Sequence, residues 1–209
     1  MNKLVKTAII IFIFLCASNI SYAERITKQQ ELDKLSVFIS NFVEARIEVR
    51  DIKSFLTEKN ADKLLEFGIF HNYLNNWKTR FENAKCPKDS EGKQAIETKY
   101  VVESIEKFFG YKLKTLPESI NGSTVLKNNC YYLYAGDGEM YPNAIVSYAE
   151  RNPKNNHILL AGITYYPDYE DGNFDSDGIA FFTAEVKPAI WNRKQTYNLI
   201  RLVTHSKDK

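Results

Sequence analysis

Hydrophobic residues recur at helical spacing through the first half of the chain. The longest series predicts one amphipathic helix over residues 27–56, because Thr27 and Gln30 form a capping box before it. Its apolar side would consist of Leu32, Leu35, Phe38, Ile39, Phe42, Val43, Ile52, Phe55 and Leu56. The opposite side carries charges of alternating sign, which is typical of a solvated helix face.

Three shorter helices should follow this one. We expect the first over residues 60–67, capped by its asparagine and ended by the next glycine, and the second with one apolar side of Phe70, Leu74, Trp77 and Phe81. The last should begin at Asp89 or Ser90 and end at Gly110, and its buried side would be Ile96, Tyr100, Ile105, Phe108 and Phe109.

From Tyr111 onward the pattern changes to short runs rich in Val, Ile, Thr, Tyr and Phe, separated by turn residues. These runs predict strands over residues 111–116, 124–134, 143–151, 157–166, 179–187 and 196–205. The expected reversals are Asn121-Gly122, Gly136-Asp137-Gly138, Asn152-Pro153 and Asp171-Gly172, and such short connections make neighbouring strands antiparallel. Pro188 should end the fifth strand.

Helices followed by a meander predict an α+β fold, with N-terminal helices packed on one face of a curved, mainly antiparallel C-terminal sheet. We expect a single domain over residues 24–209, with a helical half (24–110) and a β-rich half (111–209). This order of elements is similar to that of cone-shaped domains of the nuclear transport factor 2 type. The resemblance implies an apolar pocket between sheet and helices, and it assigns a role to no individual residue.

Residues 1–23 have the features of a secretory signal peptide. Two lysines precede an apolar run over residues 8–17, and Ser21 and Ala23 place small residues at the positions that a signal peptidase reads. The run is too short to cross about 30 Å of hydrocarbon as a helix. We therefore expect a bacterial protein, periplasmic or secreted, that begins at Glu24 and has no membrane span after cleavage.

Lipid attachment is the alternative to simple cleavage, because Cys16 lies inside the apolar run. A lipidated cysteine normally follows a small residue and has a leucine three positions before it. This chain has Leu15 and Ile13 at those positions. Cleavage after Ala23 is the favoured interpretation.

The mature chain is electrically neutral. Of the 28 Lys and Arg residues two lie in the leader, which leaves 26 to balance the 26 Asp and Glu residues. A neutral chain without a basic block lacks the footprint that nucleic acid requires, so we expect no nucleic-acid partner.

Cys86 and Cys130 remain after cleavage, and an even count in an exported protein predicts a disulfide. Closing a loop of about 45 residues would stabilise the fold by ~4 kcal/mol in the chain-entropy description. Redox catalysis is the alternative, but the spacing is not Cys-x-x-Cys. The bridge should fasten the end of a helix to the start of a strand.

An acidic run near the C-terminus is a candidate calcium site. Its carboxylates alternate with glycines, and a hard cation prefers six to eight oxygen ligands. The ligands would be Asp168, Glu170, Asp171, Asp175 and Asp177. A solvated turn between two strands is the alternative explanation of the same residues, since the ligand spacing of a helix-loop-helix calcium loop is absent. Calcium is therefore the only cofactor that the sequence suggests.

Tyrosines gather in the β-rich half, and paired tyrosines place rings on both faces of a strand. The candidate binding surface consists of Tyr132, Tyr134, Tyr148, Tyr166 and Tyr169. Exposed tyrosines suit a protein, peptide or glycan partner because they give contact area at low entropic cost. Cross-strand packing within the sheet is the alternative explanation.

Catalytic signatures are sparse. His71, His157 and His205 are scattered without a local motif, and strand carboxylates such as Glu139, Glu150 and Glu185 have no partner that spacing reveals. We therefore expect an exported, non-catalytic binding protein that engages a protein or cell-envelope component, as an inhibitor or immunity protein would. The alternative is a small periplasmic hydrolase or lyase with a pocket between sheet and helices.

Overall fold

The computed structural model describes residues 23–134, 141–166 and 179–205. Its helices are α2 (Gln29–Glu44), α3 (Ile52–Phe55), the 3-10 turn η1 (Glu58–Asn60), α4 (Ala61–Arg80) and α5 (Thr98–Phe109). One sheet is formed by β1 (Glu24–Arg25), β6 (Asn143–Arg151), β7 (Ile158–Tyr165), β8 (Ala180–Trp191) and β9 (Lys194–His205). The other is formed by β2 (Gln94–Glu97), β3 (Ser119–Ile120), β4 (Thr124–Lys127) and β5 (Cys130–Leu133).

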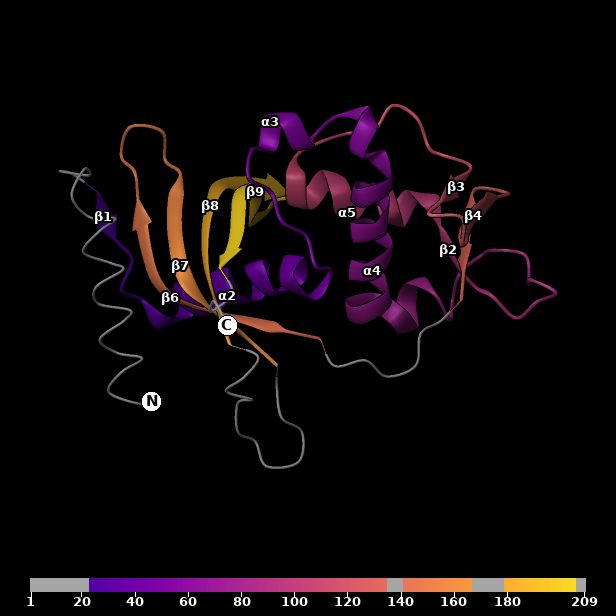
Figure 1. Cartoon of the computed structure of the whole chain (residues 1–209), viewed down its shortest axis with the longest axis horizontal. Coiled ribbons are helices and arrows are strands. Elements are labelled where there is room, and N and C mark those ends of the chain that lie inside the picture. The colour runs from indigo at the N-terminus through magenta and orange to yellow at the C-terminus, as the bar shows by residue number, and fades with distance from the viewer. Residues whose placement is uncertain (1–22, 135–140, 167–178, 206–209) are drawn as a thin grey trace.

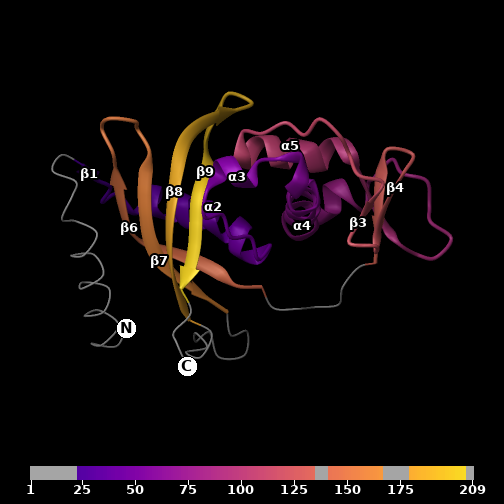
Figure 2. The ribbon, with the colours of Figure 1, turned by 45° about the horizontal axis from the view of Figure 1, so that its top comes forward.

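The α+β class is confirmed. The large sheet has the order β1-β6-β7-β8-β9, the small sheet has the order β2-β5-β4-β3, and every pairing is antiparallel. Helices α4 and α5 lie between the two sheets, and α2 packs against β6 (Figure 1). In Figure 2 the long strands β8 and β9 bend along their length. No helix in the described ranges is long and apolar enough to cross a membrane.

The single helix predicted over residues 27–56 is wrong, because α2 ends at Glu44. Arg46 adopts a positive φ of 52°, and the N–H of Ile47 donates to the carbonyl of Phe42 at 2.9 Å. Val49 then exchanges two backbone hydrogen bonds with Leu202 of β9, at 2.9 and 2.8 Å. The backbone groups after the helix thus form hydrogen bonds with β9 in place of helical ones. The predicted capping box also fails, since Lys28 occupies the N-cap and no side chain caps the helix.

The glycine predicted to end a helix instead lies inside one. Helix α4 continues through Gly68. A glycine is required there because α5 passes so close that a Cβ would lie 2.6 Å from the carbonyl oxygen of Val101. Asn60 does precede this helix, but its side chain donates backward to the carbonyls of Ser54 and Phe55. A glycine needed for close packing therefore resembled a helix stop in the sequence.

The last helix starts later than predicted. Its expected first turns are partly occupied by β2, which pairs with β5 and so joins the helical half to the β-rich half. Asp89 accepts hydrogen bonds from the backbone N–H groups of Glu91 and Lys93 and closes a turn there. Gly110 ends α5 as predicted, in the left-handed conformation with φ 64°.

The observed strands agree best with the predicted ranges where one face of the strand is buried. Strand β6 has the predicted bounds, whereas residues 111–116 form no strand. The run over residues 124–134 is a hairpin of β4 and β5, turned at Asn128 and Asn129, which both have positive φ. Strand β8 continues through Pro188, because beyond Val186 it pairs with β9 alone and such an edge tolerates proline.

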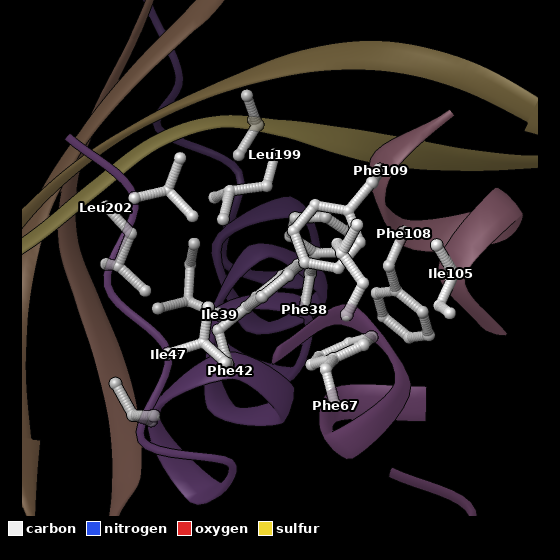
Figure 3. Packing of buried hydrophobic residues seen from close by; sticks show 14 of the residues in the cluster. Phe38, Ile39, Phe42, Ile47, Phe67, Ile105, Phe108, Phe109, Leu199 and Leu202 are labelled. Carbon is white, nitrogen blue, oxygen red and sulfur yellow. The ribbon is translucent and has the colours of Figure 1, made fainter. Parts of the chain in front are cut away.

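The hydrophobic core extends between α2 and the large sheet and across to α4 and α5 (Figure 3). Its centre is five phenylalanine rings with centroids 5.0–5.7 Å apart, from α2 (Phe38, Phe42), α4 (Phe67) and α5 (Phe108, Phe109). Leu199 and Leu202 of β9 close this core from the sheet side. Packed side chains therefore fill the centre of the region where the resemblance implied an apolar pocket, and a hollow lies at its margin between α2, α5 and β9.

Side chains of α2 also close the outer edge of β6. The backbone N–H groups of Ala144 and Val146 donate to the hydroxyls of Ser40 and Ser36, each at 2.9 Å. These N–H groups would otherwise lie at an open sheet edge, where a foreign strand could pair with them. Because Val49 covers Leu202 of β9 at the other edge, each edge of the large sheet is protected over part of its length.

We expect the double variant Ser36→Ala/Ser40→Ala to be destabilised by about 2–4 kcal/mol, because it leaves the covered N–H groups of Ala144 and Val146 without acceptors. Urea unfolding followed by circular dichroism measures the change. Ser147→Ala is the matched control, since Ser147 lies in the same strand with an exposed side chain. Equal stability of the double variant and the control would contradict this role for the two serines.

Candidate functional site

The large sheet has one face packed against α2 and one face without a described covering element. Side chains alternate along β7, where Ile158 and Leu160 are buried against the helix and Leu159, Ala161 and Ile163 point to the opposite face. Strand β8 continues this open face with Phe181, Thr183 and Glu185. The open face therefore has an apolar centre along β7 and β8.

A row of charged residues crosses the open face in register. Arg25 of β1 lies opposite Glu150 of β6, which pairs with Leu159 of β7. Leu159 in turn lies opposite Glu185 of β8, which pairs with Arg201 of β9. The row thus reads cation, carboxylate, leucine, carboxylate, cation across five strands, and cross-strand neighbours of opposite charge stabilise such an arrangement.

Tyr148 is held in place at one end of this row. Its hydroxyl donates to the carboxylate of Glu150 at 2.5 Å, and the guanidinium of Arg25 lies 5.5 Å from the centre of its ring. Arg25 thus makes a cation–π contact with Tyr148, and the strand register places it beside Glu150. The sequence did not reveal the part of Arg25, because only the β1–β6 register brings this residue beside Glu150.

The open face contains a hollow of about 420 Å³, lined by strand residues that include Tyr148, Glu150, Glu185, Arg201 and His205. Carboxylates, an arginine, an imidazole and a phenol thus converge on an apolar floor. This combination is typical of a binding site, where apolar contact supplies affinity and a few polar groups supply orientation.

The imidazole of His157 lies beside the hollow and is oriented by one of its carboxylates. Its Nδ1 is 2.5 Å from Oε1 of Glu185. Because a carboxylate can only accept this hydrogen bond, Nδ1 carries a proton, and Nε2 is the ring nitrogen left to exchange a proton with another group. His157 therefore has the arrangement of an imidazole that could act as a base.

A second hollow, of about 630 Å³, lies between α2, α5 and β9, and its lining includes Lys34, Val37, Asn41, Lys107 and Tyr197. Burial lowers the pKa of Lys107 and raises the pKa of Tyr197, which Glu31 raises further. Its acidic rim residue Glu31 is paired with Arg151 at 3.2 Å.

Asn41 connects the second hollow to a buried histidine. The Nδ1 of His71 lies 2.7 Å from Oδ1 of Asn41, whose amide donates to the carbonyl of Val37. His71 is 8% exposed, and burial, with a smaller effect from Lys107, lowers its pKa to about 4. His71 is therefore a neutral structural group that joins α4 to α2.

The structure does not bring the candidate tyrosines onto one surface. Tyr132 is buried in the small sheet and its hydroxyl donates to the carbonyl of Pro87. Tyr134 is 61% exposed at the end of the same sheet, and Tyr148 belongs to the large sheet. Tyr166 directly follows β7, and Tyr169 lies outside the described residues.

Cys86 and Cys130 form a disulfide, with their Cα atoms 6.1 Å apart. Cys86 follows α4 and Cys130 begins β5, so the bridge fastens the end of a helix to the small sheet. The acidic candidates for calcium, residues 168, 170, 171, 175 and 177, lie outside the described residues. Within the described ranges no three His, Cys, Asp or Glu side chains gather as metal ligands would.

No protein family, curated protein or solved structure matches this chain. The argument for function therefore rests on the geometry of the open face.

The low pKa of His71 makes stability depend on pH. Above pH 6.5 the ring is neutral both folded and unfolded, but below it the unfolded chain takes up a proton that the folded chain refuses until about pH 4. We expect this group alone to remove about 3 kcal/mol of stability between those values. Urea unfolding at a series of pH values, compared between wild type and His71→Gln, isolates the contribution.

The variant should lose less stability on acidification than the wild type does. Parallel curves for the two proteins would show that His71 is protonated equally in the folded and unfolded states, and would contradict the assignment.

Proposed function

We propose that this protein is an exported, non-catalytic binding protein that engages a protein partner of the cell envelope through the open face of its large sheet. The observation that carries the proposal is the composition of this face, an apolar centre crossed by a charged row that runs from Arg25 to Arg201. Protein interfaces have this anatomy, with an apolar core and a polar border that sets orientation.

The covered parts of the sheet edges favour the face as the place of contact. A partner that added a strand at these parts would have to displace Ser36 and Ser40 from β6 or Val49 from β9. The open face requires no such rearrangement, since its residues already point outward. Side chains restrained by cross-strand neighbours also lose little freedom on binding.

The disulfide supports the exported location. Structural disulfides persist in oxidising compartments and are rare in the cytosol. The bridge between Cys86 and Cys130 is consistent with maturation outside the cytosol, where the leader peptide would direct the chain.

A variant of the open face tests the proposal. Leu159→Arg replaces the apolar centre of the row with a long cation beside Glu150 and Glu185. We expect it to reduce crosslinking to the partner by at least about tenfold, since the lost apolar contact and the bulk of the new side chain cost the interface more than about 1.4 kcal/mol. The measurement is chemical crosslinking in envelope extracts, with each adduct quantified by mass spectrometry in wild type and variant.

Val37→Arg is the matched control, because Val37 is 68% exposed on α2, away from the open face. It should keep every adduct that the wild type forms. Adducts equally abundant with Leu159→Arg, or no protein adducts with the wild type, would overturn the proposal. Thermal melting of each variant establishes that it is folded.

Hydrolysis or elimination is the second candidate function, and the pairing of His157 with Glu185 beside the hollow is the observation that favours it. An imidazole oriented by a carboxylate is a common general base, and removing such a base costs about 10²–10⁴ in rate. The hollow is large enough for a small substrate.

Under the binding proposal, we expect the wild type to show no turnover above that of His157→Asn on ester, peptide, glycoside and uronate substrates. Product formation followed by chromatography is the measurement. A rate at least about 100-fold above the variant's, with a pH profile set by one basic group, would establish the enzymatic function instead.

A further inference from the structure

The distal half of the β8–β9 hairpin extends beyond the rest of the large sheet. Pairing with β7 ends at Val186, and from Lys187 onward the two strands pair only with each other. The connection is a two-residue turn at Asn192 and Arg193, both with positive φ, as tight hairpins require. Figure 2 shows this turn at the outer margin of the molecule. The hairpin tip, residues 187–195, thus pairs with no other strand, although its residues 189–191 line a shallow hollow together with Glu106, Lys107 and Gly110 at the end of α5.

Apolar and cationic side chains are concentrated at this tip. Ile190 is 76% exposed, and Trp191 follows it just before the turn. Lys187, Arg193 and Lys194 are exposed, and the sequence from 187 to 198 contains no acidic residue. None of the three cations has a carboxylate partner in the described part of the chain.

Both the apolar and the cationic residues of the hairpin tip can reach a surface that the tip approaches end-on. Ile190 and Trp191 point to opposite faces of the ribbon because they are neighbours in a strand. Ile190 pairs with Gln195, and Trp191 pairs with Lys194. In an end-on approach Arg193 of the turn comes first, Trp191 and Lys194 follow at one level, and Ile190 lies one residue behind them.

We propose that the hairpin tip docks on the surface of an anionic phospholipid bilayer. Tryptophan prefers the interface between headgroups and acyl chains, and exposed lysine and arginine are attracted to anionic headgroups. This docking is separate from the binding function of the open face and does not depend on it.

A bilayer fits the tip better than an acidic protein does. A stable protein interface buries about 800 Å² on each partner, whereas a two-residue turn with its flanking residues offers a small convex surface. A bilayer needs only a few side chains to enter its interface, and its charge is spread along the surface. Amphipathic elements bind membranes by this combination of apolar insertion and electrostatic attraction.

Tryptophan fluorescence tests the docking directly. The chain has two tryptophans, so Trp77→Phe leaves Trp191 as the only reporter. On addition of vesicles of phosphatidylcholine with phosphatidylglycerol, we expect the Trp191 emission to shift to shorter wavelength and the protein to float with the vesicles. Vesicles of phosphatidylcholine alone should have a much smaller effect.

Charge variants determine whether the cations act as proposed. In the same background, Arg193→Gln/Lys194→Gln should weaken partitioning about 25-fold, a factor of about five for each cation removed. Lys88→Gln/Lys127→Gln is the matched control, because it removes two exposed cations that lie outside the hairpin tip, with Lys127 on β4 of the small sheet, and it should leave partitioning unchanged. Ile190→Ser should also weaken binding.

Three outcomes would overturn the proposal. The first is an unshifted Trp191 emission with anionic vesicles, and the second is equal partitioning of the two charge variants. The third is a photo-crosslinker at position 190 that, in cell envelopes, yields an adduct with an acidic protein and none with lipid.

Discussion

The packing of five phenylalanine rings is the interaction on which the rest of the structure depends. These rings come from three helices that are far apart in the chain, and each ring lies within 5.7 Å of at least two others, centroid to centroid. Aromatic pairs at this spacing contribute about 0.5–1.5 kcal/mol each beyond the area they bury. The cluster fixes α2, α4 and α5 relative to one another, and through Leu199 and Leu202 it fixes them to the sheet.

Helix α2 has a second function that follows from this position. Because the core holds one side of the helix against the sheet, Ser36 and Ser40 come within hydrogen-bond distance of the β6 backbone. The segment after the helix then crosses to β9 and pairs through Val49. One continuous piece of chain therefore covers part of each edge of the large sheet, and no described element covers the open face.

The open face and the hairpin tip differ in what they offer. The open face is broad and has charges of both signs in register, which suits a partner of complementary shape and charge. The tip is narrow and cationic, with two apolar side chains at its end. If both surfaces act as proposed, the protein binds a membrane with one part and presents its sheet to a second molecule with another. Chemistry at His157 would use the same open face and would not require the tip.

The sequence predicted elements well wherever local pattern and tertiary packing ask for the same residue types. The bounds of β6, the end of α5 at Gly110 and the disulfide between Cys86 and Cys130 are confirmed. The prediction from the sequence failed where a residue is required for packing against, or pairing with, a segment that is distant in the chain. Gly68 looked like a helix stop but serves the approach of α5, and Val49 looked helical but pairs with β9.

The candidate site divides in the same way. Glu150, Glu185, His157 and Tyr148 were recognisable as residues that can carry chemistry, because their side chains have that capacity in any fold. Their assembly was not recognisable, since it depends on the register of five strands whose pairing no local pattern encodes. The sequence by itself thus determined the class of fold, the leader pattern and the bonded cysteines, which follow from composition and periodicity. Only the tertiary structure decided which residues face each other, because contacts between distant segments are set by packing of the whole chain.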